Sequence, residues 1–165
     1  MKNISPYRSG SQAGSLRPPP PNIRRDMIFV FGSNTAGRHG AGAARTALLQ
    51  HGAVYGQGEG HYGYSYALPT KEPVVRPRRA GEPGIQTLPL VTIGMHVEKF
   101  IRYARDHSEL KFQVTQLGCG LAGLKPEWIA PMFKKAPENC YFDHAWRLHL
   151  PTREGDDYRY WGTYP

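Results

Sequence analysis

Two glycine-rich segments, each placed between a predicted strand and a predicted helix, constrain this chain more than any other feature. The first runs from Gly32 to Gly42, after the apolar run 27–31, and the second runs from Gly118 to Gly123, after the strand pattern 111–117. A helix that begins after such a loop offers unpaired N–H groups and the positive end of its dipole, which together favour a phosphate. The two segments therefore predict a phosphate site assembled from two strand ends.

Strand and helix patterns alternate along the rest of the chain. Strands are predicted at 27–31, 64–68, 111–117 and 139–142, with Pro69 ending the second and a loop over 72–89. Helices are predicted at 43–49, along the apolar stripe of 93–104, and from Pro126, where Pro131 makes the helix short or kinked. The expected buried side of this last helix consists of Trp128, Ile129, Met132 and Phe133. This alternation predicts an α/β sheet with helices on both faces and a ligand beyond the carboxyl ends of its strands.

Composition divides the chain into three parts. Residues 1–26 form a basic, proline-rich arm with few apolar side chains, expected to be flexible. Residues 27–150 form the ligand-binding domain, and residues 151–165 form an aromatic C-terminal extension that packs back on the domain or meets a partner.

The net charge of +8 raises the question of nucleic-acid binding. Residues 1–26 contribute +4, residues 71–79 contribute +3, and everything else sums to +1. The positive charge thus belongs to an arm and one loop, which predicts at most weak nucleic-acid contact through the arm.

No apolar run reaches the 18 residues that a membrane-spanning helix needs, and no secretory signal opens the chain. Cys119 and Cys140 form neither a disulfide framework nor a metal-ligand cluster. We expect a cytoplasmic protein without membrane contact, metal or cofactor.

The second glycine segment fits the G-x-G-x-x-G pattern, and Asp143 lies 20 residues beyond Gly123, as in a dinucleotide-binding fingerprint. That fingerprint belongs to a first βαβ unit, whereas this one begins at residue 118, and it leaves the first glycine segment unexplained. Two loops that hold one diphosphate account for both segments better.

Three motifs in order resemble those of the macrodomains. The first is Asn34 followed by His39-Gly40-Ala41-Gly42, close to the viral macrodomain pattern except for Ala41. The others are Leu68-Pro69-Thr70-Lys71 and the loop 117–123. The resemblance covers about residues 27–143 and implies a three-layer α/β/α macrodomain-like fold with a mixed sheet that binds ADP-ribose.

The resemblance also implies roles for individual residues. Asn34 would contact the distal ribose, and Tyr141 or Phe142 would lie near the adenine. The ligand-binding residues expected in this way are Asn34, Gly40, Ala41, Gly42, Gly118, Cys119, Gly120, Leu121, Ala122, Gly123 and Phe142. Macrodomains place an aspartate well upstream of the first loop to hold the adenine amino group, but no acidic residue precedes Asp26 here.

Lys71 and His39 are the candidate catalytic residues. Lys71 matches the lysine nucleophile of the terminal ADP-ribose protein glycohydrolases, whose partner aspartate is replaced here by Ala122. His39 has the chemistry to relay a proton or orient a water molecule.

Three functions remain open at this stage. One is hydrolysis of an ADP-ribose derivative, either by an ADP-ribosyl hydrolase that removes ADP-ribose from an ADP-ribosylated macromolecule or by an ADP-ribose 1″-phosphate phosphatase. The second is a module that reads or sequesters ADP-ribose or a related NAD-derived nucleotide without turnover, and the third is a nucleic-acid-associated protein.

Overall fold

A single mixed β-sheet lies at the centre of the computed structural model, which describes residues 26–73, 85–155 and 157–162. The strand order is β2-β3-β1-β5-β6-β7, and β4 pairs with β3 off this path. The strands are β1 (Met27–Asn34), β2 (Gly60–Tyr62), β3 (Ser65–Pro73), β4 (Ile85–Thr87), β5 (Lys111–Val114), β6 (Cys140–Asp143) and β7 (Arg159–Trp161). The run β3-β1-β5-β6-β7 is parallel, whereas β2 and β4 are antiparallel to β3.

The first five residues of β1, 27–31, are all apolar because both faces of the strand are buried. Ile28 and Val30 belong to one hydrophobic cluster, and Phe29 and Phe31 belong to another. Successive side chains of a strand point to opposite faces of the sheet, so the two clusters are the two sides of a three-layer structure. The predicted α/β/α fold with helices on both faces is confirmed.

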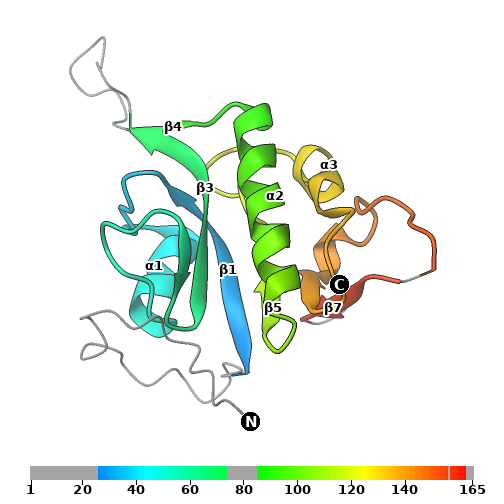
Figure 1. Cartoon of the computed structure of the whole chain (residues 1–165). Coiled ribbons are helices and arrows are strands. Elements are labelled where there is room, and N and C mark those ends of the chain that lie inside the picture. The colour runs from blue at the N-terminus through cyan, green and yellow to red at the C-terminus, as the bar shows by residue number, and fades with distance from the viewer. Residues whose placement is uncertain (1–25, 74–84, 156, 163–165) are drawn as a thin grey trace.

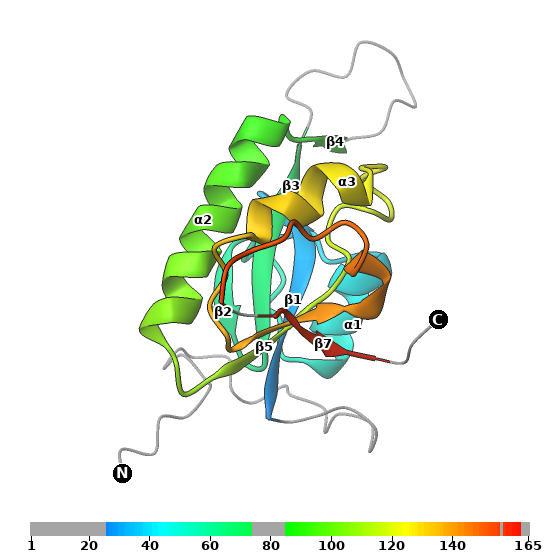
Figure 2. The same cartoon turned by 90° about the vertical axis from the view of Figure 1, so that its right-hand side faces the viewer.

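Helix α1 (Gly42–Gln50) covers one face through Ala44 and Ala47, and helix α2 (Leu90–Asp106) covers the other. Figures 1 and 2 show the two helices on opposite sides of the sheet. The predicted apolar stripe of α2 is confirmed, since all five of its residues are buried: Ile93, Val97, Phe100, Ile101 and Ala104.

The segment around Pro69 differs from the prediction. β3 continues through Pro69 as far as Pro73, and the pairing with β1 shifts register between Ser33 and Asn34 beside it. A proline is tolerated in a sheet at such an irregularity, because the missing N–H leaves no regular ladder bond broken. β4 also forms inside the segment that was predicted to be a loop, residues 72–89.

Two short helical elements, each with a proline near its start, follow β5. Helix α3 (Pro126–Ile129) begins at Pro126 as predicted and passes at Ala130 into the 3-10 helix η2 (Ala130–Phe133), which contains Pro131. Ile129 and Phe133 are buried, but Trp128 is 44% exposed, so its predicted burial is wrong. The Lys125 ammonium lies 5.4 Å from the centre of the Trp128 ring instead.

The C-terminal segment adds an edge strand that the hydrophobic pattern did not predict. β7 pairs in parallel with β6, and the Trp161 indole N–H donates to the Val114 carbonyl oxygen at 2.8 Å. A 3-10 helix, η3 (His144–Trp146), follows β6 and buries Trp146 against the core.

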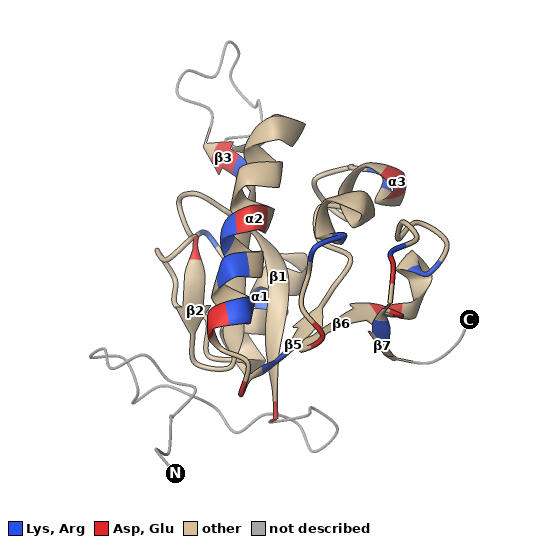
Figure 3. Ribbon diagram, turned by 45° about the vertical axis from the view of Figure 1, so that its right-hand side comes forward, with Lys and Arg blue, Asp and Glu red and all other residues tan. Residues whose placement is uncertain are grey.

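Charges of both signs are interspersed on the described surface, as Figure 3 shows for α2. The described residues hold 13 Lys and Arg against 11 Asp and Glu, a net charge of +2 out of the +8 of the whole chain. The proposed nucleic-acid contact falls on residues 1–25 and most of 71–79, which lie outside the described residues. None of the described helices is long and apolar enough to cross a membrane.

Asn139 fastens the C-terminal end of α2 to the start of β6. Its side-chain NH₂ lies 2.9–3.1 Å from the carbonyl oxygens of Ala104, His107 and Leu110, and the residue is 8% exposed. Asn139→Ala should lower the free energy of unfolding by about 1–3 kcal/mol, because buried carbonyl groups lose their donor. Urea denaturation measures this, with the exposed Ser108→Ala as a control expected within about 0.5 kcal/mol of wild type. Equal stability of the two variants would contradict this role for Asn139.

Candidate functional site

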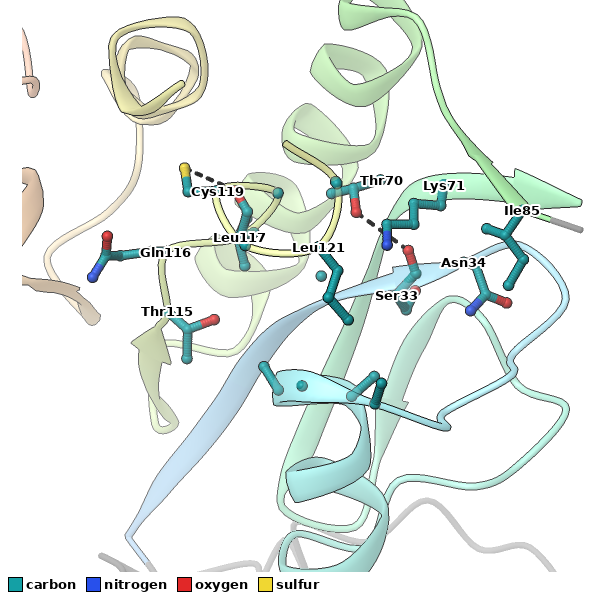
Figure 4. Close-up of a pocket in the computed structure, with 18 of the residues that line it drawn as sticks. Ser33, Asn34, Thr70, Lys71, Ile85, Thr115, Gln116, Leu117, Cys119 and Leu121 are labelled. Carbon is teal, nitrogen blue, oxygen red and sulfur yellow. Dashed lines mark hydrogen bonds between the residues drawn. The ribbon is translucent and has the colours of Figure 1, made fainter. Parts of the chain in front are cut away.

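A pocket of about 780 Å³ lies at the carboxyl ends of β3, β1, β5 and β6 (Figure 4). This is the edge at which a parallel sheet receives its ligand. Both glycine-rich loops border the pocket. The lining residues are Gly32, Ser33, Asn34, Arg38, Gly40, Ala41, Gly42, Ala43, Ala44, Tyr55, Thr70, Lys71, Ile85, Thr115, Gln116, Leu117, Gly118, Cys119, Gly120, Leu121, Ala122 and Asp143.

The Asn34 side chain shapes the first loop. Its Oδ1 accepts from the Arg38 N–H at 2.9 Å, and its Nδ2 donates to the Arg38 carbonyl oxygen at 2.8 Å. Both hydrogen bonds stay within the loop, so they curl residues 34–38 into a closed turn. One N–H of the Asn34 amide remains for a ligand.

Gly37 allows this turn to pack against the segment that follows α1. Its φ is +69°, and a Cβ at this position would lie 2.4 Å from the Gln57 nitrogen and from the Gly56 carbonyl carbon. Gly58, in the segment after α1, is constrained by the first loop in the same way, since a Cβ there would lie 2.2 Å from the Asn34 carbonyl oxygen. The Ser33 hydroxyl donates to the Gly58 carbonyl oxygen. The first loop and residues 56–58 are thus fitted together backbone to backbone.

His39 belongs to this support and not to the wall of the pocket. It is 1% exposed, its Nε2 lies 3.0 Å from the Gln57 carbonyl oxygen, and its ring packs edge-on against Phe31. Burial lowers the pKa of His39 below its ordinary value, which favours the neutral ring. The His39 ring does not line the pocket, and its catalytic role stays a prediction.

The first turn of α1 faces the pocket with free backbone donors. Gly42, Ala43 and Ala44 line the pocket, and the N-cap residue Ala41 makes no side-chain capping bond. The first acceptor inside the helix is the Ala41 carbonyl oxygen, which receives the Arg45 N–H. The N–H groups of residues 42–44 therefore have no intrahelical acceptor, and no acidic side chain occupies the first turn.

The second loop is a compact turn with donors of the same kind. Leu124 N–H donates to the Gly118 carbonyl oxygen at 2.8 Å and Gly123 N–H to that of Gly120 at 3.0 Å. Gly118 and Gly123 have φ values of +75° and +71°. Within the described part of the chain, the N–H groups of Gly120 and Leu121 have no hydrogen-bond acceptor.

The two loops come together at Leu121 and Gly42. A Cβ at Gly42 would lie 3.4 Å from Leu121 Cδ1, and Leu121 is 71% exposed. Figure 4 shows the Leu121 side chain extending from the second loop toward the beginning of α1. The two loops therefore approach each other where both carry free N–H groups.

Lys71 lies at the end of β3, where the strand pairs with both β1 and β4. Its side chain borders the pocket beside Thr70 and Ser33 (Figure 4), and partial burial lowers its pKa. The lining contains one carboxylate, that of Asp143. β3, which carries Lys71, and β6, which carries Asp143, are three strand spacings apart, roughly 14 Å across the sheet.

The predicted ligand-binding residues divide into two groups. Nine of them line the pocket: Asn34, Gly40, Ala41, Gly42, Gly118, Cys119, Gly120, Leu121 and Ala122. Gly123 and Phe142 do not, and Phe142 is fully buried among Phe133, Trp146 and Tyr158. Cys119 is half-buried, and burial raises the pKa of its thiol, so the thiolate is disfavoured.

Several lining residues were missed from the sequence. Gln116 lies two residues beyond β5, and Asp143 is the last residue of β6. A polar residue at the carboxyl end of a parallel strand is the signal that could have found them. Tyr55 and Arg38 border the pocket from loops whose course no local pattern predicts. Among the described residues, no group of three His, Cys, Asp or Glu side chains is placed to hold a metal ion.

The fit between the first loop and residues 56–58 predicts opposite effects for two glycine substitutions. Gly37→Ala should destabilise the protein by at least about 1–2 kcal/mol, because the residue is left-handed and its Cβ meets backbone. Gly94→Ala, in α2 with open space around the added Cβ, should stabilise it by up to about 1 kcal/mol. Thermal unfolding of both variants decides this, and a Gly37→Ala protein as stable as wild type would refute the interlocked arrangement.

Comparison with known proteins gives one structural similarity. No protein-family model matches the chain, and no curated protein is similar to it in sequence. A solved structure of Thermosipho africanus DarTG in complex with ADP-ribose superposes with a TM-score of 0.45 and 16% sequence identity. The superposition covers 72% of this chain and 38% of that one, so the chain spans well under half the length of the structure it matches.

Proposed function

We propose that this protein binds ADP-ribose or a closely related nucleotide, with the diphosphate held between the two glycine-rich loops. The observation that carries this proposal is the meeting of the loops at Gly42 and Leu121, where both present N–H groups without an acceptor. Backbone donors from a helix N-terminus and from a turn form the concave, positively polarised surface that phosphates prefer.

The charges around the pocket support an anionic ligand. Arg38 and Lys71 border the end formed by β1 and β3, and the described residues include no ion-pair partner for either. Asp143 borders the opposite end. A diphosphate between the loops would therefore have two cations on one side and the one carboxylate of the lining on the other.

Asn34 is suited to hold a sugar hydroxyl at the cationic end. Its amide retains one free N–H after the two bonds to Arg38, and the residue is 6% exposed. Those two bonds also fix the direction of the remaining N–H. We assign the distal ribose to this corner, in line with the resemblance of 34–42 to the first macrodomain loop.

Binding without turnover agrees best with the side chains of the pocket. A hydrolase needs a nucleophile or base together with an acid near the scissile bond. Lys71 has no carboxylate beside it among the lining residues, since the corresponding position of the second loop is Ala122. We infer a module that reads or sequesters ADP-ribose.

Hydrolysis through Lys71 is the second candidate. The ammonium group borders the pocket, and its lowered pKa increases the fraction of neutral, nucleophilic amine. This makes a direct test worthwhile.

Gly120→Val tests the diphosphate site. A Cβ at Gly120 meets no atom within 4 Å, so the folded chain accepts the larger side chain, while the space beside its N–H is filled. Calorimetric titration with ADP-ribose should show an affinity about tenfold or more below wild type, the cost of displacing a charge-assisted hydrogen bond. Gly94→Val, which adds the same side chain in open space on α2, should bind as wild type does. Normal binding by a folded Gly120→Val protein would remove the diphosphate from the second loop.

Lys71→Ala separates the two candidate functions. A binding module should release no ADP-ribose from ADP-ribosylated protein or nucleic acid, and Lys71→Ala should weaken ADP-ribose binding by about 1 kcal/mol through loss of one charge. Lys111→Ala, at the start of β5 and outside the lining, controls for net charge. Release by wild type that Lys71→Ala abolishes and Lys111→Ala preserves would establish hydrolysis and overturn binding without turnover.

A further inference from the structure

We propose that Gln116 reads the base of the bound nucleotide, and that Asp143 fixes the orientation of the Gln116 amide so that the site selects adenine over hypoxanthine. This inference rests on the proposed function, which places a nucleoside diphosphate in the pocket. It adds the residues that recognise the base.

The register of the sheet brings the two residues together. Val114 of β5 is paired with Phe142 of β6, so Gln116 and Asp143 lie just beyond that pair at the carboxyl ends of adjacent strands. Both line the pocket, and the Gln116 Nε2 donates to the Asp143 Oδ2 at 3.2 Å. Figure 4 shows Gln116 on the side of the pocket opposite Asn34 and Lys71.

The charges around the pocket favour the end beside Gln116 and Asp143 as the place of the base. Phosphates are repelled by the Asp143 carboxylate and attracted by Arg38 and Lys71 across the pocket. A base is neutral and carries hydrogen-bond donors and acceptors, so the acidic, amide-bearing end suits it. The ligand therefore lies along the strand ends with its base over β5 and β6 and its distal ribose near β1 and β3.

Asp143 determines which way the Gln116 amide faces. A carboxylate accepts hydrogen bonds and cannot donate them, so the NH₂ group of Gln116 must lie toward Asp143 and the Oε1 must lie away from it. The carboxylate is itself held in place, because its Oδ1 accepts from the Ala145 N–H at 2.9 Å at the start of η3. Gln116 therefore offers the base an acceptor, Oε1, beside the second N–H of its amide.

This pattern matches adenine and opposes hypoxanthine. Adenine presents the 6-amino donor beside the N1 or N7 acceptor, which a carboxamide pairs with through two hydrogen bonds. Hypoxanthine has a carbonyl oxygen in place of the amino group and would set it against Oε1. An amide free to rotate would accept either base, whereas the amide held by Asp143 does not.

The test compares ADP-ribose with its inosine analogue by calorimetry, using the full-length chain. Wild type should prefer ADP-ribose by about tenfold or more, the discrimination expected of a good amide–base pair. Gln116→Ala should bind the two nucleotides within about threefold of each other. Gln113→Ala, which removes a glutamine of β5 outside the pocket lining, should keep the wild-type preference.

Asp143→Asn tests the orienting role with almost no change of shape. Its Oδ1 still accepts from Ala145, so its new NH₂ group faces Gln116 and turns the Gln116 amide over. The preference for ADP-ribose should be reversed in this variant, because the turned amide suits hypoxanthine, and mere loosening of the fold would not reverse it.

The possible outcomes distinguish failure of this inference from failure of the proposed function. Tight ADP-ribose binding by wild type with equal affinity for the inosine analogue, or an unchanged preference in Asp143→Asn, would overturn this inference and leave the proposed function standing. Failure of wild type to bind either nucleotide would overturn both.

Discussion

The site depends on the backbone fit between the first glycine-rich loop and residues 56–58. At both Gly37 and Gly58, an added Cβ would overlap with the backbone of the other segment. Buried His39 and the Ser33 hydroxyl add hydrogen bonds between the same segments. The loop is thereby held in a single shape before a ligand arrives, and preorganisation of this kind reduces the entropy lost on binding.

A pocket built in this way recognises its ligand mainly through the main chain. Glycine and alanine dominate both loops, so the donors that face the cavity are amide groups that no side-chain substitution removes directly. The few polar side chains stand at the two ends, with Lys71 and Arg38 at one and Asp143 at the other. The pocket therefore has a cationic end and an acidic end. Its lining offers little of the acid and base side by side that hydrolysis requires.

Local sequence patterns predicted the parts of the fold that repeat at a fixed spacing. The apolar run of β1, the stripe of α2 and the helix start at Pro126 follow from periodicity and from the fixed φ of proline. β4 and β7 were not predicted, because three-residue edge strands owe their conformation to the strands beside them.

The candidate site was predictable to a similar extent. The glycine-rich loops are recognisable in the sequence, and nine of the expected ligand-binding residues line the pocket. His39 was predicted to be catalytic and Phe142 to bind the ligand, but both side chains turn into the protein interior, where they are at most 1% exposed. Gln116 and Asp143 were missed as a pair because their contact depends on the pairing of β5 with β6.

The most direct test of the central claim is to follow the backbone amide resonances of the isotope-labelled protein during titration with ADP-ribose. The largest shifts should fall on residues 42–44, Gly120 and Leu121, because their free N–H groups bind the diphosphate. Shifts concentrated elsewhere, for example on the exposed face of α2, would contradict it. An unchanged spectrum at saturating ADP-ribose would show that the two loops serve a different ligand.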